Sequence, residues 1–366
     1  LMLNYGGYYA GSLWAYFGVE NRDLFDGSAP WLDQALVDVA RFICRGTYLR
    51  NLTTDLPSYE PGETIKRSVV VENLGPKAVE CTVRFAVCAD GDRTKPAAHA
   101  QVSVTVEPGA STTVESPCRP VELDSDVYEV LADLIIDGKP VDRMTSGFVA
   151  LDEEVVQSGR KLRFEGNYFT LDGRPVFLYG SDTYANVYTS ACENPWTWNL
   201  DHIAARDYGF NVYENLQYSN PNYVFNDKDW RRFEGMAQLC QRNGLAFMPC
   251  QLVGHNVAID DALLEKQAAQ VKDYAEHLNR YPGLLYYLNG DFRWEIDDKE
   301  AVSELWNRWL AETYGTEAAW RQSWGDEVYG EWGKLQYPPP GESAWDSTLQ
   351  CDRARFGIWV TLRWVN

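Results

Sequence analysis

The sequence predicts a multidomain protein of mixed class, in which an antiparallel β-sandwich precedes the first half of a (β/α)8 TIM barrel. Two observations support this prediction. Short Val/Thr-rich runs separated by Pro-Gly and Asp-Gly turns fill residues 51–155, a spacing typical of a sandwich. From residue 160 to residue 366, helical stretches, glycines and apolar strands recur at a period of roughly 35 residues, as parallel βα units require.

The amino-acid composition argues against several kinds of binding partner for this protein. The 366 residues carry 53 acidic and 33 basic side chains, a net charge of −20, which disfavours nucleic acid and anionic membranes as partners. No apolar run approaches the ~18 residues that span a bilayer. The eight cysteines form no CxxC pair and the four histidines are dispersed, so we expect no metal and no cofactor. No secretory signal is visible. A secreted or cytoplasmic location and a homo-oligomeric state both stay open.

Residues 1–50 predict the tail of a preceding domain. Apolar side chains recur every three or four positions over residues 31–43, which indicates one amphipathic helix. No complete fold fits into so few residues, and a helix predicted over 352–365 closes the sequence where a further strand is expected. We therefore expect the chain to be a fragment of a larger protein.

Residues 51–155 predict a β-sandwich of immunoglobulin type. Strands are expected over 64–72, 81–88, 101–107, 111–114 and 127–136, with turns at Pro61-Gly62, Pro108-Gly109 and Asp137-Gly138. Such a module is usually a spacer or a packing partner. A disulfide between Cys81 and Cys118 is one possibility, and buried free thiols are the favoured alternative.

The barrel region begins with a hairpin over 168–175 and continues with four predicted strands. These strands cover 176–180, 210–217, 245–254 and 284–291, with helices over 199–208, 229–242 and 260–281 between them. Gly209, Gly244 and Gly283 each directly precede a strand. We expect these glycines to take the left-handed conformation that ends a helix.

Polar side chains stand at the predicted carboxyl ends of these strands, where the chemistry of an α/β barrel takes place. Asp291 ends the fourth strand and is the predicted catalytic residue. The predicted substrate-binding residues are Asp182, Tyr184, Glu214, Asn215, Gln251, His255, Asn289 and Trp294. Hydrolysis of a glycosidic bond needs two carboxylates in such a rim, one as proton donor and one as nucleophile.

Each of these candidates also has a structural alternative. The carboxylate of Asp291 could cap the next helix after an Asn-Gly-Asp turn. Glu214 could serve as an internal ion-pair partner, and His255 as a hydrogen-bonded loop residue. The many Trp and Tyr rings, Trp294 among them, could stack on a sugar or could simply pack in a core.

One stretch resembles a known family. Residues 310–325, LAETYGTEAAWRQSWG, with Trp332 and the run 337–340, YPPP, resemble the insertion after the fourth strand of glycoside hydrolase family 42 β-galactosidases. The stretch 169–178, FTLDGRPVFL, is similar to the start of retaining barrel glycosidases of the wider clan. Together the resemblance covers residues 160–366.

This resemblance implies a retaining hydrolase of β-linked saccharides, with β-galactosides among the candidates, and a carbohydrate substrate as partner. In that clan the fourth strand ends in Asn-Glu, and Gly290 and Asp291 stand at those positions here. The nucleophilic glutamate of the seventh strand would lie beyond Asn366, so the rest of the barrel must come from the same polypeptide or from another chain. The family's zinc-binding cysteines are not matched. The alternative is a catalytically degenerate barrel that binds carbohydrate or acts as a scaffold.

Overall fold

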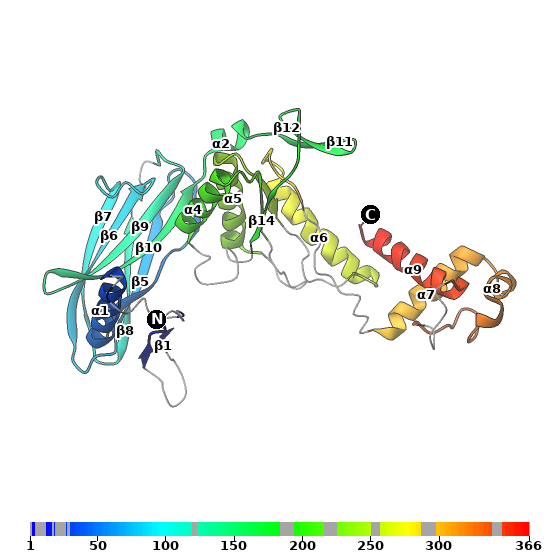
Figure 1. The fold of residues 1–366 in the computed structure, drawn as a ribbon, viewed down its shortest axis with the longest axis horizontal. Helices are drawn as coiled ribbons and strands as arrows, with labels where there is room; N and C mark the ends of the chain where they lie inside the picture. The colour runs from blue at the N-terminus through cyan, green and yellow to red at the C-terminus, as the bar shows by residue number, and fades with distance from the viewer. Residues whose placement is uncertain are drawn as a thin grey trace.

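The computed structural model describes residues 2–3, 12–16, 18, 27, 30–118, 123–183, 194–215, 225–249, 257–286, 298–338 and 346–365. Figure 1 shows a β-sandwich, a parallel α/β unit and a group of C-terminal helices in chain order. Within these residues, no helix combines the length and the apolar character that crossing a membrane requires.

The first helix confirms the predicted amphipathic segment. Helix α1 covers Pro30–Arg45 and ends directly before strand β3. Its residue Leu32 is buried, and the ring of Phe42 lies 5.3 Å from that of Tyr48 in β3. A two-stranded ribbon, β1 (Met2–Leu3) with β2 (Leu13–Trp14), precedes the helix.

The sandwich consists of two sheets that share one apolar core. One sheet has the strand order β4-β10-β9-β6-β7 and the other the order β3-β5-β8. The strands are β3 (Thr47–Thr54), β4 (Ser58–Tyr59), β5 (Ile65–Asn73), β6 (Val79–Ala89), β7 (Ala98–Val106), β8 (Ala110–Cys118), β9 (Val127–Ile136) and β10 (Lys139–Ala150). Alternate side chains of β5 and β6, such as Val69 and Val83, are fully buried between the sheets. This is the period-two pattern of a half-buried strand.

All five strands predicted in this region are present. Strands β3, β4 and β10 were not predicted, because polar residues or irregular backbone interrupt their patterns. In β3 the pairing slips at Asn51, whose φ is +54°, and β10 begins with Lys139-Pro140 and is buried only toward its end. Cys81 is a buried free thiol, so a disulfide with Cys118 is ruled out.

A three-stranded antiparallel sheet leads from the sandwich into the α/β unit. Helix α2 (Glu153–Ser158) precedes β11 (Leu162–Glu165), β12 (Tyr168–Leu171) and β13 (Arg174–Val176). The predicted hairpin is confirmed. Asp172 and Gly173 both have positive φ, at +53° and +75°, which is the turn that suits the twist of a hairpin.

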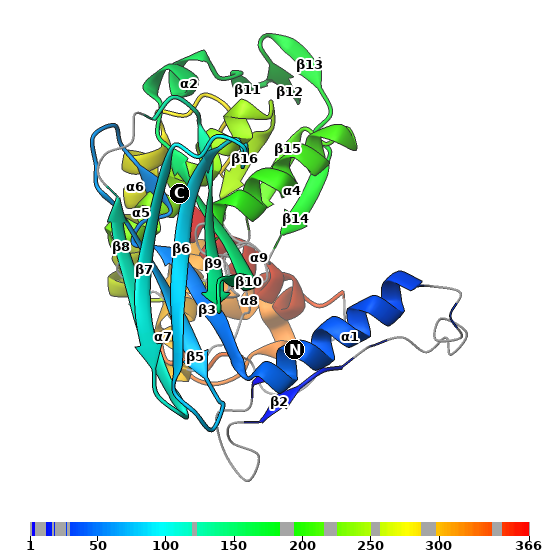
Figure 2. The same cartoon turned by 90° about the vertical axis from the view of Figure 1, so that its left-hand side faces the viewer.

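The α/β unit follows as three strand–helix pairs. Its strands β14 (Gly180–Thr183), β15 (Val212–Asn215) and β16 (Ala246–Pro249) are parallel and lie in chain order. Its helices are α4 (Pro195–Asp207), α5 (Asp227–Arg242) and α6 (Asp261–Leu278). Figure 2 shows α4 beside β9 and β10 of the sandwich, on which it packs.

Two predictions about this unit are wrong. The first parallel strand begins at Gly180 and not at Val176, because Val176 pairs with Phe169 in the hairpin sheet. Gly209 and Gly244 have the predicted left-handed conformation, with φ of +86° and +70°, but Gly283 does not. Helix α6 ends at Leu278, so its last turn lies well before Gly283. Position 283 is glycine because a side chain there would overlap a neighbouring side chain.

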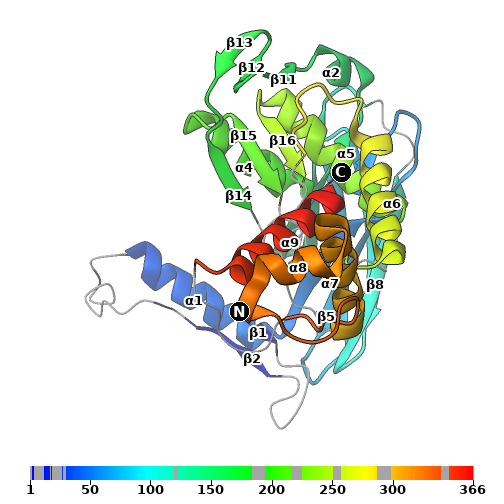
Figure 3. The same cartoon turned by 90° about the vertical axis from the view of Figure 1, so that its right-hand side faces the viewer.

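The C-terminal helices form an aromatic unit of their own. Figure 3 shows α9 (Thr348–Val365) lying across α7 (Lys299–Tyr314) and α8 (Glu317–Trp324). A short 3-10 turn, Gly325–Glu327, follows α8. Trp306, Trp320 and Phe356 are fully buried where these helices meet. The predicted helix over 352–365 is confirmed and begins four residues earlier.

Candidate functional site

The candidate site is the edge at which the parallel strands β14, β15 and β16 end. Pairing sets Asp182 opposite Glu214 and Thr183 opposite Asn215. On the next strand, Glu214 stands opposite Met248. Because parallel strands bring their carboxyl ends to one edge of a sheet, the backbone gathers two predicted carboxylate positions there.

The sheet has one face toward the helices and one face away from them. Tyr213 and Phe247 pack in the same buried cluster as α4, α5 and α6. Val212, Ala246 and Met248 instead belong to a cluster with residues of the antiparallel hairpin sheet. Side chains alternate along a strand. The half-buried Glu214 therefore lies on the face of Val212, away from the helices.

A fourth segment extends the parallel sheet at β16. Leu284 forms a parallel bridge with Phe247. The amide of Phe247 donates to the Gly283 carbonyl at 2.8 Å, and the amide of Leu285 donates to the Phe247 carbonyl at 2.9 Å. Residues 283–285 therefore run parallel to β16, in the direction of the edge that holds Glu214.

Several predicted site residues lie outside the described residues. These are Tyr184, Gln251, His255, Asn289, Asp291 and Trp294. For Asp182 and Asn215 the structure gives the strand and the register but not the side chain. Glu214 is thus the predicted residue whose side chain the structure describes, and the catalytic role of Asp291 stays a prediction.

Asn211 is a positioning residue that the sequence analysis missed. Its Oδ1 accepts from the Tyr179 amide at 2.8 Å, and its Nδ2 donates to the Phe177 carbonyl at 2.8 Å. Its own amide donates to the Tyr179 carbonyl at 2.9 Å. Asn211 thereby ties the start of β15 to the segment that enters β14. The only sequence signal was its place between a helix-ending glycine, Gly209, and an apolar strand.

Close backbone contact also holds β14 against β15. A Cβ added at Gly180 would overlap the carbonyl oxygen of Val212 and lie 2.5 Å from its Cγ1. Only glycine leaves room for this approach. Asn211 and Gly180 together fix how far each of the two strands reaches toward the candidate edge.

The buried imidazole of the unit lies on the helix side, away from the candidate edge. His202 on α4 is fully buried, and burial lowers its pKa to about 3. Its Nε2 is 3.7 Å from the Cys240 sulfur, and its ring meets Tyr213 edge to face at 4.2 Å. A neutral, enclosed ring of this kind is structural. Over the part of the chain that the structure describes, no three His, Cys, Asp or Glu side chains gather as metal ligands.

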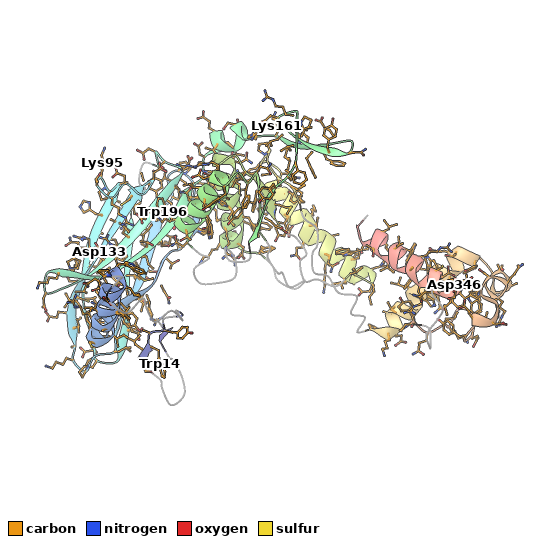
Figure 4. All side chains as sticks on the ribbon, in the orientation of Figure 1. Trp14, Lys95, Asp133, Lys161, Trp196 and Asp346 are labelled. Atoms are coloured by element: carbon orange, nitrogen blue, oxygen red, sulfur yellow. The ribbon has the colours of Figure 1, made fainter. Side chains whose placement is uncertain are left out.

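The sandwich supports the helices behind the sheet. Arg242 at the end of α5 pairs with Asp90 at 2.6 Å and with Asp126 at 3.3 Å. Gln238 of the same helix donates to the Ala150 carbonyl at 2.6 Å. Figure 4 shows Trp196, from the first turn of α4, at the boundary with the sandwich strands. The sheet is therefore held through its helices by a second folded unit.

Comparison with known proteins gives structural neighbours only. No protein-family model matches the chain, and no curated protein sequence matches it. Among solved structures, the chain is similar to a candidate β-galactosidase from Bacteroides fragilis, with 17% identity, a TM-score of 0.30 and coverage of 74% of this chain and 37% of that one. It is also similar to the Bacteroides uniformis β-glucuronidase, with 14% identity, a TM-score of 0.32 and coverage of 76% of this chain and 32% of that one.

A third neighbour is a family 2 β-galacturonidase from Eisenbergiella tayi bound to galacturonate, with 16% identity, a TM-score of 0.29 and coverage of 74% and 44%. The chain therefore spans less than half the length of each of these three structures. By their names, the neighbours are β-glycosidases. The family named for this third neighbour is family 2, so the comparisons do not single out family 42 for this chain.

Proposed function

We propose that the protein is a retaining glycoside hydrolase that acts on β-linked saccharides, with β-galactosides as the first substrates to test. The observation that carries the proposal is the shared edge of β14, β15 and the segment after Gly283. Asp182 and Glu214 stand in register there, and the parallel bridge at Leu284 directs the chain toward Asp291. Glycosidases built on barrels place their catalytic and substrate-binding side chains at such an edge, so its carboxylate positions support the proposal.

The proposed architecture is an immunoglobulin-type sandwich over 51–155 and the first half of a TIM barrel over 160–366, after a tail over 1–50. In a doubly wound sheet the strand order reverses and helices cover both faces. Here the strands follow chain order, and α4, α5 and α6 pack on the same face. This arrangement supports a barrel, whose remaining strands would come from the same polypeptide or from another chain.

Asp291 is proposed as the general acid/base. As an acid it would give its proton to the departing glycosidic oxygen, and as a base it would then activate the water that releases the sugar. The nucleophile would be a glutamate on one of the remaining strands of the proposed barrel. The residues proposed to bind the substrate are Asp182, Tyr184, Glu214, Asn215, Gln251, His255, Asn289 and Trp294.

Aryl β-glycosides with different leaving groups test this role in the full-length protein. Asp291→Asn removes the proton donor, so turnover of a poor leaving group such as phenol should fall about 10²- to 10⁴-fold. Dinitrophenolate leaves without a proton, so kcat/KM for its glycoside, which reports cleavage of the glycosidic bond, should fall much less. Its kcat should fall as well, because Asp291 is also the base that releases the sugar. Equal turnover of both glycosides in the variant and the parent would refute the assignment of Asp291.

A second function is favoured by one specific observation. Gly290-Asp291 stands where the resembled clan has Asn-Glu. In that clan the Asn side chain holds the 2-hydroxyl of the sugar, and glycine provides no side chain for this contact. A degenerate barrel that only binds carbohydrate fits this difference. Calorimetric titration with β-linked oligosaccharides, combined with an absence of turnover by the full-length protein on a broad glycoside panel, would favour binding over hydrolysis.

A further inference from the structure

The start of the fourth parallel segment is held by backbone contacts on two sides. The Leu162 amide of the hairpin sheet donates to the Pro282 carbonyl at 3.0 Å. On the other side, Phe247 of β16 bonds to both Gly283 and Leu285. Neither contact by itself sets the distance of the segment from the helix behind it.

The side chain of Gln241 on α5 fills the space between two glycines. A Cβ added at Gly159 would overlap Oε1 of Gln241, and one at Gly283 would overlap Nε2. Neither glycine needs its conformational freedom, because Gly159 has an ordinary extended backbone, with φ −61° and ψ 156°, and the φ of Gly283 is not in the left-handed region. Both positions are glycine to leave room for the carboxamide.

Gln241 fills the space between Gly159 and Gly283, which we call the slot, with the volume of its side chain. It is buried, at 9% exposure, and its Oε1 has no hydrogen-bond partner among the described residues. Gln238, one helical turn earlier, behaves differently: its amide bonds to the Ala150 carbonyl and accepts from the Asp152 amide at 2.8 Å. Helix α5 thus bonds to the sandwich through Gln238, whereas the side chain of Gln241 acts as a spacer.

We propose that Gln241 is a positioning residue that sets where the segment beginning at Gly283 lies, and so where Asp291 stands relative to a bound glycoside. The inference rests on the proposed function and adds to it a residue that touches no substrate. Because reacting groups must be held to within a fraction of an ångström, emptying the slot should impair proton donation more than it impairs substrate binding.

The test uses the full-length protein and the same pair of aryl glycosides. Gln241→Ala should lower kcat for the poor leaving group about 10- to 100-fold, while kcat/KM for the dinitrophenyl glycoside and KM for the phenyl glycoside change little. Gln241→Met keeps the length of the side chain without its amide and should restore kcat. Gln238→Ala is the matched control, and it should lower both rates by the same factor if it lowers them at all.

The outcomes separate the inference from the proposed function. If Asp291→Asn shows no leaving-group dependence, the proposed function fails. If Asp291→Asn shows that dependence and Gln241→Ala does not, only the positioning role fails. A Met variant as impaired as the Ala variant would also overturn the role as a spacer. Should Gln241→Ala not fold, Gln241→Asn, shorter by one methylene, gives the same comparison.

Discussion

Trp196 occupies the space that a side chain at position 147 would need. A Cβ added at Gly147 would lie 2.7 Å from the Trp196 Cβ and 2.8 Å from its backbone nitrogen. Gly91 is similarly close, with a Cβ 2.6 Å from the Trp196 ring. Gly147 and Gly91 of the sandwich therefore leave the space that Trp196, in the first turn of α4, occupies.

Gly147→Ala should destabilise the protein, because the added methyl must displace Trp196 or the neighbouring Tyr128 carbonyl. Overpacking of this kind costs roughly 1–3 kcal/mol, measurable by urea denaturation. Gly235→Ala is the control at the same boundary. Its methyl would meet Ser58 and Val149 at an ordinary 3.4 Å, and alanine favours a helix by about 1 kcal/mol. Equal loss of stability in both variants would contradict the steric argument.

Asp352 should be essential to the C-terminal helices. This fully buried carboxylate accepts from the Tyr314 hydroxyl at 2.5 Å and from the Trp324 indole at 2.8 Å, and pairs with Arg355 at 3.2 Å. Asp352→Ala leaves buried donors without a partner and should cost about 3 kcal/mol or more. Near-ultraviolet circular dichroism should lose the tryptophan signal at lower denaturant. Tyr314→Phe, which removes one donor, should cost about half as much.

Stability should fall as the pH drops below 6.5, partly because of His202. Its pKa in the folded state is about 3, against 6.5 when unfolded. The unfolded state therefore takes up the proton first, and the stabilisation present above pH 6.5 is lost as the pH falls toward 3. Between pH 6.5 and 5 the loss should be about 2 kcal/mol. Urea denaturation at the two pH values measures it. His202→Gln should remove most of this difference, and His99→Gln, which changes an exposed side chain, should leave it intact.

Asn211→Ala should loosen the start of β14. It removes the hydrogen bonds to the Tyr179 amide and the Phe177 carbonyl, which together should stabilise the fold by roughly 1–3 kcal/mol. Hydrogen exchange at Tyr179 should accelerate, because that amide loses its acceptor. Asn211→Asp keeps the acceptor and should protect the Tyr179 amide. Unchanged exchange in the alanine variant would show that the strand pairing alone holds this segment.

Helices were well predicted where their ends carry local chemical signals. Helix α5 begins within two residues of its predicted start, where Asn226 and Asp229 form a reciprocal capping box. Helix α4 begins four residues before its predicted start, at Pro195, with Asn194 as its cap. The Asn-Pro pair contained that signal, but the missing apolar period at the first turn obscured it.

The candidate edge was predictable in part. Two apolar strands joined by a helix predict parallel neighbours, but the register that sets Asp182 opposite Glu214 was not predicted, because the first strand was expected to end at Gly180. The slot formed by Gln241, Gly159 and Gly283 was not predictable. Its residues lie far apart in the sequence, and contacts of this kind produce no periodic pattern that a sequence analysis could detect. The conformation predicted for Gly283 was wrong for the same reason, since a glycine required by a distant side chain looks like a helix-ending glycine.

Helix α5 has a practical consequence for anyone who shortens this protein. Met236 and Phe233 are buried in a cluster that includes Val127 and Val149 of the sandwich. Cutting the chain near residue 160 to isolate the α/β unit would expose this apolar surface to water and remove the partners of Gln238 and Arg242. We expect a shortened protein to aggregate, so the sandwich has to be expressed together with the α/β unit.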